Sequence, residues 1–260
     1  MSALPLLVAK GITKRFGGVQ ALSEVGFTIH HGEIYGLIGP NGAGKTSLFN
    51  VLTGIYPTDA GTFDFDGAPL GGSKPNEVAE RGIARTFQNI RLFANLSALE
   101  NVMIGRHVRT HATVFGAIFR NRRTIEEEKS IEHRAYELLE YVGVQRRAND
   151  LAKHLAYGDQ RRLEIARALA TEPKLLALDE PAAGMNATET TALKRLLEQI
   201  RRDGTTILLI EHDMKLVMSV CDRVLVLDYG KKIAEGPAAE VQRDERVIQA
   251  YLGGEVTLTK

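Results

Sequence analysis

The sequence has very little of what disulfide-bonded, membrane-spanning and nucleic-acid-binding proteins are built from. It contains a single cysteine, Cys221, and no tryptophan. One cysteine excludes an internal disulfide and a multi-thiolate metal site, and it fits a reducing compartment. We expect Cys221 to be an ordinary buried residue. No run in the sequence approaches the roughly 18 apolar residues of a membrane-spanning helix. Positive and negative charges nearly cancel, 33 against 32, so we expect no nucleic-acid partner.

The N-terminal region lacks the charge order of a secretion signal. The apolar residues 3–9 precede the positive charges of Lys10, Lys14 and Arg15, whereas a signal peptide has its charges first. This order favours a first β-strand. We therefore expect a water-soluble chain in the cytosol.

The composition that remains is that of an ordinary globular protein. The 260 residues are 44% apolar and 25% charged, which allows one large core or a core with a smaller lobe. Apolar residues alternate over short segments up to about residue 70, which predicts strands with one buried face. Between about 90 and 160 they recur at helical spacing, as at Ile131, Ala135 and Leu138. Helices and apolar strands alternate after that, so the sequence predicts an α/β fold with an inserted helical lobe.

A phosphate-binding loop is predicted between a strand and a helix. The motif G-x-x-x-x-G-K-[ST] is matched at every fixed position by Gly39, Pro40, Asn41, Gly42, Ala43, Gly44, Lys45 and Thr46, and the helix continues from Ser47. Glycine lets the backbone bring N–H groups against phosphate oxygens, and the helix points its positive end at the same place. We expect residues 39–47 to bind a nucleotide, with Lys45 on the β- and γ-phosphates and the Thr46 hydroxyl on Mg²⁺.

Two acids, Asp179 and Glu180, end the apolar run 175–178. Carboxylates at that place are costly unless they meet a cation or a proton. Taken alone, an Asp-Glu pair after a strand is most often a helix cap. Beside a phosphate loop, the pattern favours Asp179 in the Mg²⁺ shell, through water, and Glu180 as the general base for an attacking water.

Residues 155–162, Leu-Ala-Tyr-Gly-Asp-Gln-Arg-Arg, separate this chain from other proteins with a phosphate loop. The segment resembles the signature motif of ABC (ATP-binding cassette) ATPases, usually L-S-G-G-Q followed by Gln-Arg-Arg. Three further residues match that family in order: Phe16 where an aromatic stacks on adenine, Gln88 in the Q-loop, and His212 as the switch histidine. Each has an ordinary alternative, as a core aromatic, a surface amide and a hydrogen-bonded histidine at a strand end. The order of these motifs along the chain favours the family, and the resemblance covers nearly the whole chain.

This resemblance implies the fold of a P-loop NTPase. The expected architecture is an α/β ABC ATPase domain with an N-terminal antiparallel β subdomain and an inserted α-helical subdomain. Residues 1–88 would form the first part of the core with the antiparallel β subdomain, and 89–160 the helical subdomain ending in the signature motif. Residues 161–240 would complete the core, and 241–260 would form a C-terminal helix and tail.

The resemblance also implies that two ATPase domains face each other, with each ATP between one chain's phosphate loop and the other's signature motif. Ala156, Gly158 and Asp159 would then close over a partner's ATP. Gln88 would sense Mg²⁺ and the γ-phosphate, and His212 would orient the γ-phosphate and the attacking water. Ala156 lacks a serine hydroxyl, and Asp159 adds a negative charge, although it suits the start of its own helix as a cap. These departures predict unequal ATP sites and pairing with a different ATPase subunit, with a homodimer as the alternative.

Longer strings resemble the ATP-binding subunits of branched-chain amino acid importers, at 85–93, 180–186, 211–215 and 250–253. That branch implies two integral-membrane permease subunits, a periplasmic or extracellular solute-binding protein that acts indirectly, and a peripheral place at the cytoplasmic face of the inner membrane. The alternatives are an importer of urea or short amides, a lipopolysaccharide exporter, and a soluble ABC ATPase without a transport role. A phosphoryl-transfer kinase would have no use for the signature motif. The basic segment 106–123 is expected to be a solvated loop, with a contact to lipid or permease as the alternative.

Overall fold

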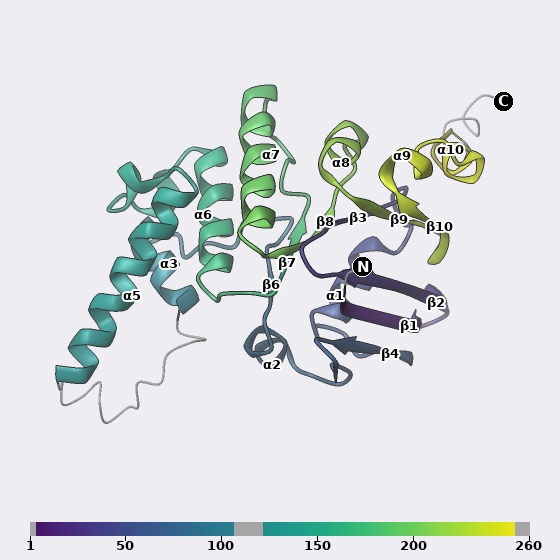
Figure 1. Cartoon of the computed structure of the whole chain (residues 1–260), viewed down its shortest axis with the longest axis horizontal. Coiled ribbons are helices and arrows are strands. Elements are labelled where there is room, and N and C mark those ends of the chain that lie inside the picture. The colour runs from purple at the N-terminus through teal and green to yellow at the C-terminus, as the bar shows by residue number, and fades with distance from the viewer. Residues whose placement is uncertain (1–3, 107–121, 253–260) are drawn as a thin grey trace. The chain divides into compact units, whose positions relative to one another are not determined.

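A computed structural model describes residues 4–106 and 122–252 of the chain (Figure 1). The chain divides into two compact units. Unit 1 is Met1–Val78 with Ala177–Lys260, and unit 2 is Ala79–Leu176. Most of the basic segment 106–123 lies outside the described residues.

Unit 1 contains an antiparallel sheet in the order β2-β1-β4-β5, of which Figure 1 labels β2, β1 and β4. Its strands are β1 (Pro5–Phe16), β2 (Val19–His30), β4 (Ala60–Phe65) and β5 (Ala68–Pro69). Burial alternates along β2, where Val25, Phe27 and Ile29 point inward. This is the period-2 pattern of a sheet with one covered face, and it is the alternation that the sequence shows.

A second sheet of six strands has the order β10-β9-β3-β8-β7-β6, and all of its strands except β6 (Ile83–Arg85) lie wholly or partly in unit 1. The other strands are β3 (Ile34–Ile38), β7 (Leu175–Asp179), β8 (Thr206–Ile210), β9 (Arg223–Asp228) and β10 (Lys231–Pro237). The boundary between the units passes through β7. β3 pairs in parallel with both β8 and β9, whereas β9 and β10 form an antiparallel hairpin. Every residue of β3, β7 and β8 is buried. Strands that are covered on both faces have nearly continuous apolar sequences, as these three strands do.

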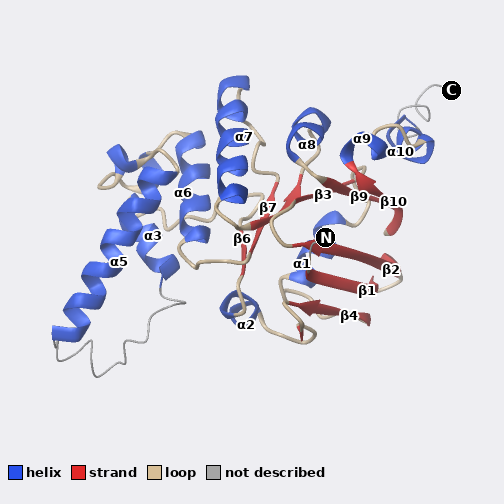
Figure 2. Ribbon diagram, in the orientation of Figure 1, coloured by secondary structure: helices blue, strands red, loops and turns tan. Residues whose placement is uncertain are grey.

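Helices accompany these strands in unit 1 (Figure 2). They are α1 (Lys45–Leu52), α7 (Ala187–Arg202), α8 (Met214–Val220), α9 (Ala238–Val241) and α10 (Glu245–Leu252). α7 begins with a capping box, in which the Asn186 side chain accepts from the Glu189 N–H while the Glu189 carboxylate accepts from the Asn186 N–H. α2 (Pro75–Glu80) lies at the end of the first segment of unit 1 and crosses into the next unit.

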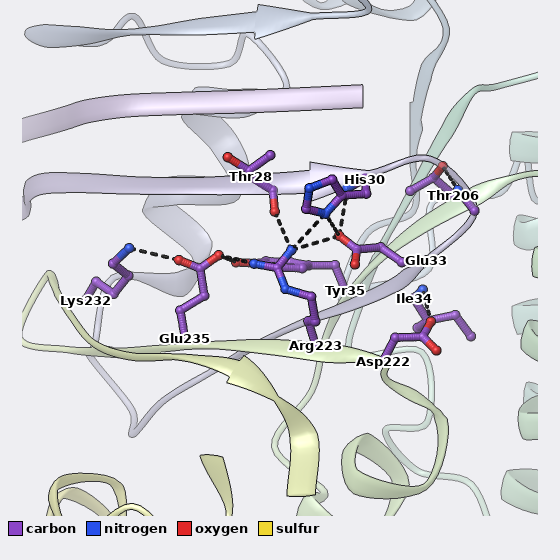
Figure 3. A network of polar contacts seen from close by, with 11 residues as sticks. Thr28, His30, Glu33, Ile34, Tyr35, Thr206, Asp222, Arg223, Lys232 and Glu235 are labelled. Atoms are coloured by element: carbon purple, nitrogen blue, oxygen red, sulfur yellow. Dashed lines mark hydrogen bonds and ion pairs between the residues drawn. The ribbon is translucent and has the colours of Figure 1, made fainter. Parts of the chain in front are cut away.

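A polar network joins the two sheets of unit 1 (Figure 3). Arg223 of β9 donates to the Thr28 carbonyl of β2 at 2.9 Å and to Glu235 of β10 at 2.8 Å. The same guanidinium lies 3.3 Å from Glu33 and 3.1 Å from His30 Nδ1. Since these are charge-assisted bonds to fixed strands, they hold β2 against the β9–β10 hairpin.

Tyr35 of β3 completes this network from the core side. The residue is fully buried and its hydroxyl donates to Glu235 at 2.8 Å. Lys232 also donates to Glu235, at 2.8 Å. Burial raises the pKa of Tyr35, so the phenol stays a neutral donor.

Unit 2 is mostly helical. Its helices are α3 (Ala98–Arg106), α5 (Arg122–Tyr141) and α6 (Tyr157–Leu169), with short 3₁₀ turns at Gln145–Arg147 and Ala152–His154. β6 (Ile83–Arg85) lies beside the start of β7, where the Gly82 carbonyl accepts from the Lys174 and Leu175 N–H groups. Gly105 of α3 approaches α6 so closely that a Cβ would lie 2.3 Å from the Arg167 carbonyl oxygen.

The buried face of α5 follows the predicted helical spacing. Ala135, Leu138 and Leu139 are buried, and Val142 just beyond the helix is also buried, whereas Ile131 is partly exposed. The predicted α/β class, with an N-terminal antiparallel subdomain and an inserted helical part, is confirmed. None of the described helices is both long enough and apolar enough to cross a membrane.

Candidate functional site

The loop after β3 has a backbone that only glycine accommodates at several positions. Gly39, Gly42 and Gly44 have φ angles of 153°, 81° and 100°. A Cβ at Gly39 would lie 2.2 Å from the Leu227 carbonyl oxygen, and one at Gly44 would lie 2.6 Å from the Ala21 carbonyl oxygen. Gly39 and Gly44 are therefore required both by dihedral angle and by space, whereas Gly42, with no atom within 4 Å of its Cβ position, is required by dihedral angle alone.

α1 starts directly after this loop. Gly44 is its N-cap and supplies no side-chain acceptor, so the first N–H groups of the helix have no side-chain cap. Asn41 and Thr46 are exposed, Pro40 and Ser47 are half-buried, and Ala43 is buried. A helix N-terminus that opens onto a glycine-rich loop is suited to bind phosphate oxygens.

Lys45 is held inside the loop that it follows. Only 8% of the residue is exposed, and its Nζ donates to the Gly39 carbonyl at 2.6 Å and to the Pro40 carbonyl at 3.0 Å. Burial lowers the pKa of Lys45, and the negative charges of Glu180 and Asp179 oppose that shift. The ammonium is thus a partly desolvated donor beside two acids, and phosphate oxygens can replace its carbonyl partners.

The acids follow the strand that the sequence predicts. Asp179 is the last residue of β7 and is buried, and Glu180 comes next with a φ of 47°. The Glu180 N–H donates to the Ile210 carbonyl at the end of β8, 2.9 Å away. His212 follows β8, and its Nδ1 lies 3.7 Å from Glu180 Oε2. The carboxyl ends of two strands therefore bring Glu180 and His212 together, at the edge where open α/β sheets bind their ligands.

Glu211 is a site residue to which sequence reasoning assigned no role. It is fully buried, and it accepts from the Ala182 N–H at 2.8 Å and from the His212 N–H at 3.2 Å. Burial raises its pKa. The residue ties the segment after Glu180 to the segment that carries His212. The signal was available, because Glu211 directly follows a buried apolar strand, as Glu180 does.

Phe16 lies at the surface of unit 1 and is not a core aromatic. It is 42% exposed, and its ring contacts Tyr56 edge to face with centroids 5.2 Å apart. Lys14 Nζ lies 5.5 Å from the centre of the ring. An exposed ring braced by its neighbours can stack against a flat aromatic ligand.

Gln88 and the signature-like segment belong to unit 2. Gln88 is exposed, and its carbonyl accepts from Arg161. α6 begins at Tyr157 with Ala156 as its N-cap, and Gly158 is buried. The cap expected from Asp159 is not found: the helix starts two residues earlier, so Asp159 lies in the first turn, while the N-cap itself has no side-chain acceptor.

Tyr157 is a second residue that sequence reasoning passed over. It stands where the L-S-G-G-Q pattern has glycine, and it is 44% exposed. Its hydroxyl accepts from Arg161 at 2.9 Å. A tyrosine in place of glycine was visible in the sequence, but its partner four residues later was not.

Comparisons with known proteins agree with this geometry. A family model described as ABC transporter matches residues 22–183, and one described as branched-chain amino acid ATP-binding cassette transporter matches residues 231–257. The chain is 44% identical to the high-affinity branched-chain amino acid transport ATP-binding protein LivG of Salmonella typhimurium, over 96% of this chain and 98% of that protein. It is 35% identical to the lipopolysaccharide export system ATP-binding protein LptB of Escherichia coli, over 97% and 99% of the two chains.

A solved structure of an ABC transporter cassette shares the fold. The crystal structure of the ADP conformation of MJ1267, an ATP-binding cassette of an ABC transporter, matches with a TM-score of 0.84 and 31% identity, over 96% of this chain and 100% of that one. ATP-binding subunits of this kind bind nucleotide, dimerise and work with membrane permease subunits. The phosphate loop, the paired acids and these likenesses lead to one conclusion: the chain belongs to the ABC transporter family, as one of its ATP-binding proteins.

Proposed function

We propose that this chain is the ATP-hydrolysing subunit of an importer that takes up the branched-chain amino acids leucine, isoleucine and valine through separate permease subunits. The observation that carries the hydrolytic part is the meeting of Lys45, Glu180 and His212 at one edge of the sheet. The choice of solute rests on the likeness to LivG, which exceeds the likeness to LptB.

The phosphate loop would bind the nucleotide with its backbone. N–H groups of Gly39 and residues 41–46 would donate to the phosphate oxygens, and Lys45 would exchange its two carbonyl partners for the β- and γ-phosphates. Thr46 and Asp179 offer a hydroxyl and a carboxylate, the hard oxygen donors that suit Mg²⁺, an ion that keeps several of its own waters. When bound, Mg²⁺ would supply charge neutralisation at the phosphates. Phe16 would stack on the adenine.

Hydrolysis would use Glu180 as the general base. Glu180 accepts a proton from a water whose oxygen forms a bond to the γ-phosphorus, while the bond from that phosphorus to the β–γ bridging oxygen breaks. His212 would orient the γ-phosphate and this water, because its Nδ1 lies 3.7 Å from Glu180 Oε2 and so beside the attacking water. Gln88 would sense Mg²⁺ and the γ-phosphate.

The chain would form half of each of two ATP sites. Ala156, Gly158 and Asp159 would close over a partner's ATP, and the exposed start of α6 leaves that end of the helix accessible. Because Asp159 places a negative charge in the first turn, it weakens this helix end as a phosphate site by about 0.3–1 kcal/mol. We therefore propose unequal sites and a different ATPase subunit as partner, with a homodimer as the alternative.

The assembly would contain two permeases and receive solute from a binding protein on the other side of the membrane. This chain would lie at the cytoplasmic face of the inner membrane, docked by protein contacts. We propose that the chain is divided by function as the sequence predicts, into residues 1–88, 89–160, 161–240 and 241–260.

The proposal is tested by co-expressing the chain with the permease and ATPase genes of its own gene neighbourhood. Co-purification with the permeases and ATP hydrolysis that is lost in Lys45→Ala are expected, since one preorganised charged donor contributes about 10²- to 10³-fold. A homodimer that hydrolyses ATP cooperatively at two equal sites would refute the proposed heterodimer. Hydrolysis by Lys45→Ala at the wild-type rate would refute the site.

A further inference from the structure

A buried ion pair on α6 lies outside the machinery described so far. Arg161 and Glu164 have side chains that are 3% and 1% exposed, and their charged atoms lie 3.3 Å apart. Burial raises the pKa of Glu164, and the charge of Arg161 opposes that shift. A buried pair of this kind is costly unless its remaining donors and acceptors are also satisfied.

Those remaining groups are satisfied by the backbone around Gln88. Arg161 donates to the Phe87 carbonyl at 2.7 Å and also to the Gln88 carbonyl. Glu164 accepts from the Phe87 N–H at 3.3 Å and from the Arg91 N–H at 3.4 Å. The pair therefore holds the segment 87–91 at both ends, and all of these residues belong to unit 2.

Tyr157 positions the Arg161 guanidinium, which bonds the Phe87 and Gln88 carbonyls. Its hydroxyl accepts from Arg161 Nη2 at 2.9 Å and from Nε at 3.2 Å, and the guanidinium carbon lies 5.4 Å from the centre of the ring. One turn of helix separates the two residues, so the tyrosine stands over the arginine. Tyr157 is half-exposed and lies within the signature motif, whereas Arg161 is buried.

We propose that Tyr157 and Arg161 are positioning residues that connect the signature motif to the Gln88 segment. A group that meets Tyr157 at the surface shifts the hydroxyl, which shifts the guanidinium that bonds the Phe87 and Gln88 carbonyls. The signature motif, which serves a partner's ATP, is thereby coupled to the glutamine that serves the chain's own ATP. This inference rests on the proposed function, because it gives a role to a contact between two of its motifs.

The first test measures amide hydrogen exchange in the full chain and needs no activity. Tyr157→Phe keeps the ring and removes the hydroxyl. We expect the Phe87 and Arg91 amides to exchange roughly three- to tenfold faster in this variant, because only part of the free energy of the lost Tyr157–Arg161 bond reaches these amides through Arg161 and Glu164. Tyr136→Phe is the matched control, because Tyr136 is a 48% exposed tyrosine on α5 of the same unit. Unchanged exchange in Tyr157→Phe, or an equal change in the control, overturns the proposal.

The second test measures ATP hydrolysis by the assembled transporter. Tyr157→Phe is expected to lower kcat roughly three- to tenfold with KM for ATP changed less than about twofold, because Gln88 acts on the γ-phosphate and not on nucleotide capture. Arg161→Lys keeps the charge but cannot bond both carbonyls in the same way. In the Arg161→Lys background, Tyr157→Phe should have no further effect.

The two tests separate this inference from the proposed function. An assembly whose wild type neither hydrolyses ATP nor transports refutes the proposed function, while the exchange measurement still decides the contact. Additive losses of kcat in the double variant overturn the coupling, even where the ATPase itself behaves as proposed. If Arg161→Lys does not fold, the single variant Tyr157→Phe still decides, through kcat and exchange together.

Discussion

Replacing Lys45 by methionine is expected to have very different effects on stability and on hydrolysis. The side chain keeps its length and loses its charge, together with two hydrogen bonds of 2.6 and 3.0 Å to the Gly39 and Pro40 carbonyls. Hydrogen bonds to charged groups contribute about 1.5–3 kcal/mol each. Part of that is offset, because burial disfavours the ammonium and lowers its pKa. We expect the free energy of unfolding of the empty chain to fall by at most about 2 kcal/mol.

Hydrolysis should fall far more, by about 10²- to 10³-fold or more, because the ammonium faces the charge that develops on the transferred phosphoryl group. The assay pairs urea unfolding with phosphate release, and Lys231→Met is the control, since Lys231 is an exposed lysine of β10. A large loss of stability with hydrolysis intact would show that Lys45 is a structural residue and not a phosphate ligand. Equal losses of hydrolysis in the two variants would also contradict its role as a phosphate ligand.

The same substitution has a pH signature. Since the pKa of Lys45 is lowered on folding, the unfolded chain binds this proton more tightly than the folded chain. Stability of the wild type relative to Lys45→Met should therefore rise with pH between the lowered pKa and the ordinary value of 10.5. A relative stability that falls over this interval would contradict the burial argument.

Three further predictions concern other parts of the site. Glu180→Gln should retain ATP binding and lose about 10²- to 10⁴-fold in turnover, which accumulates a closed dimer visible by size-exclusion chromatography with ATP. Glu211→Gln should become more stable relative to the wild type as pH rises above 4.5, because burial raises the pKa of Glu211 and makes its charged form costly in the folded chain. Urea unfolding midpoints of both proteins at pH 4 and pH 8 measure this difference, and a difference of the opposite sign contradicts it. Gly39→Ala should lose more than about 2 kcal/mol of stability, because its Cβ would lie 2.2 Å from the Leu227 carbonyl oxygen, whereas Gly18→Ala, with no atom within 4 Å, should change little.

Much of the site could be predicted because its chemistry is written in short stretches of sequence. The glycines of the phosphate loop mark positions where the backbone has a positive φ. Asp179 and Glu180 come at the end of a strand whose burial is evident from its run of leucines. Since carboxyl ends of neighbouring parallel strands share an edge, the meeting of Glu180 and His212 also follows from the strand assignments.

What could not be predicted depends on contacts between distant residues. Glu211 bonds the Ala182 N–H across 29 positions, and Arg161 bonds the Phe87 carbonyl across 74. No periodicity or motif encodes such pairs, which arise only when the strands and helices pack. The expected cap at Asp159 was wrong for a related reason, since the exact start of a helix is among the least certain features of a sequence.

Uptake of labelled leucine into vesicles that contain the permeases, with ATP on the side of this chain, measures directly whether the chain drives amino acid transport. We expect uptake that requires ATP, proceeds with the wild type and is lost with Glu180→Gln in this chain, while ATP binding persists. Uptake by the Glu180→Gln assembly at the wild-type rate, or a wild-type assembly that hydrolyses ATP but moves no leucine, isoleucine or valine, would contradict the proposed function.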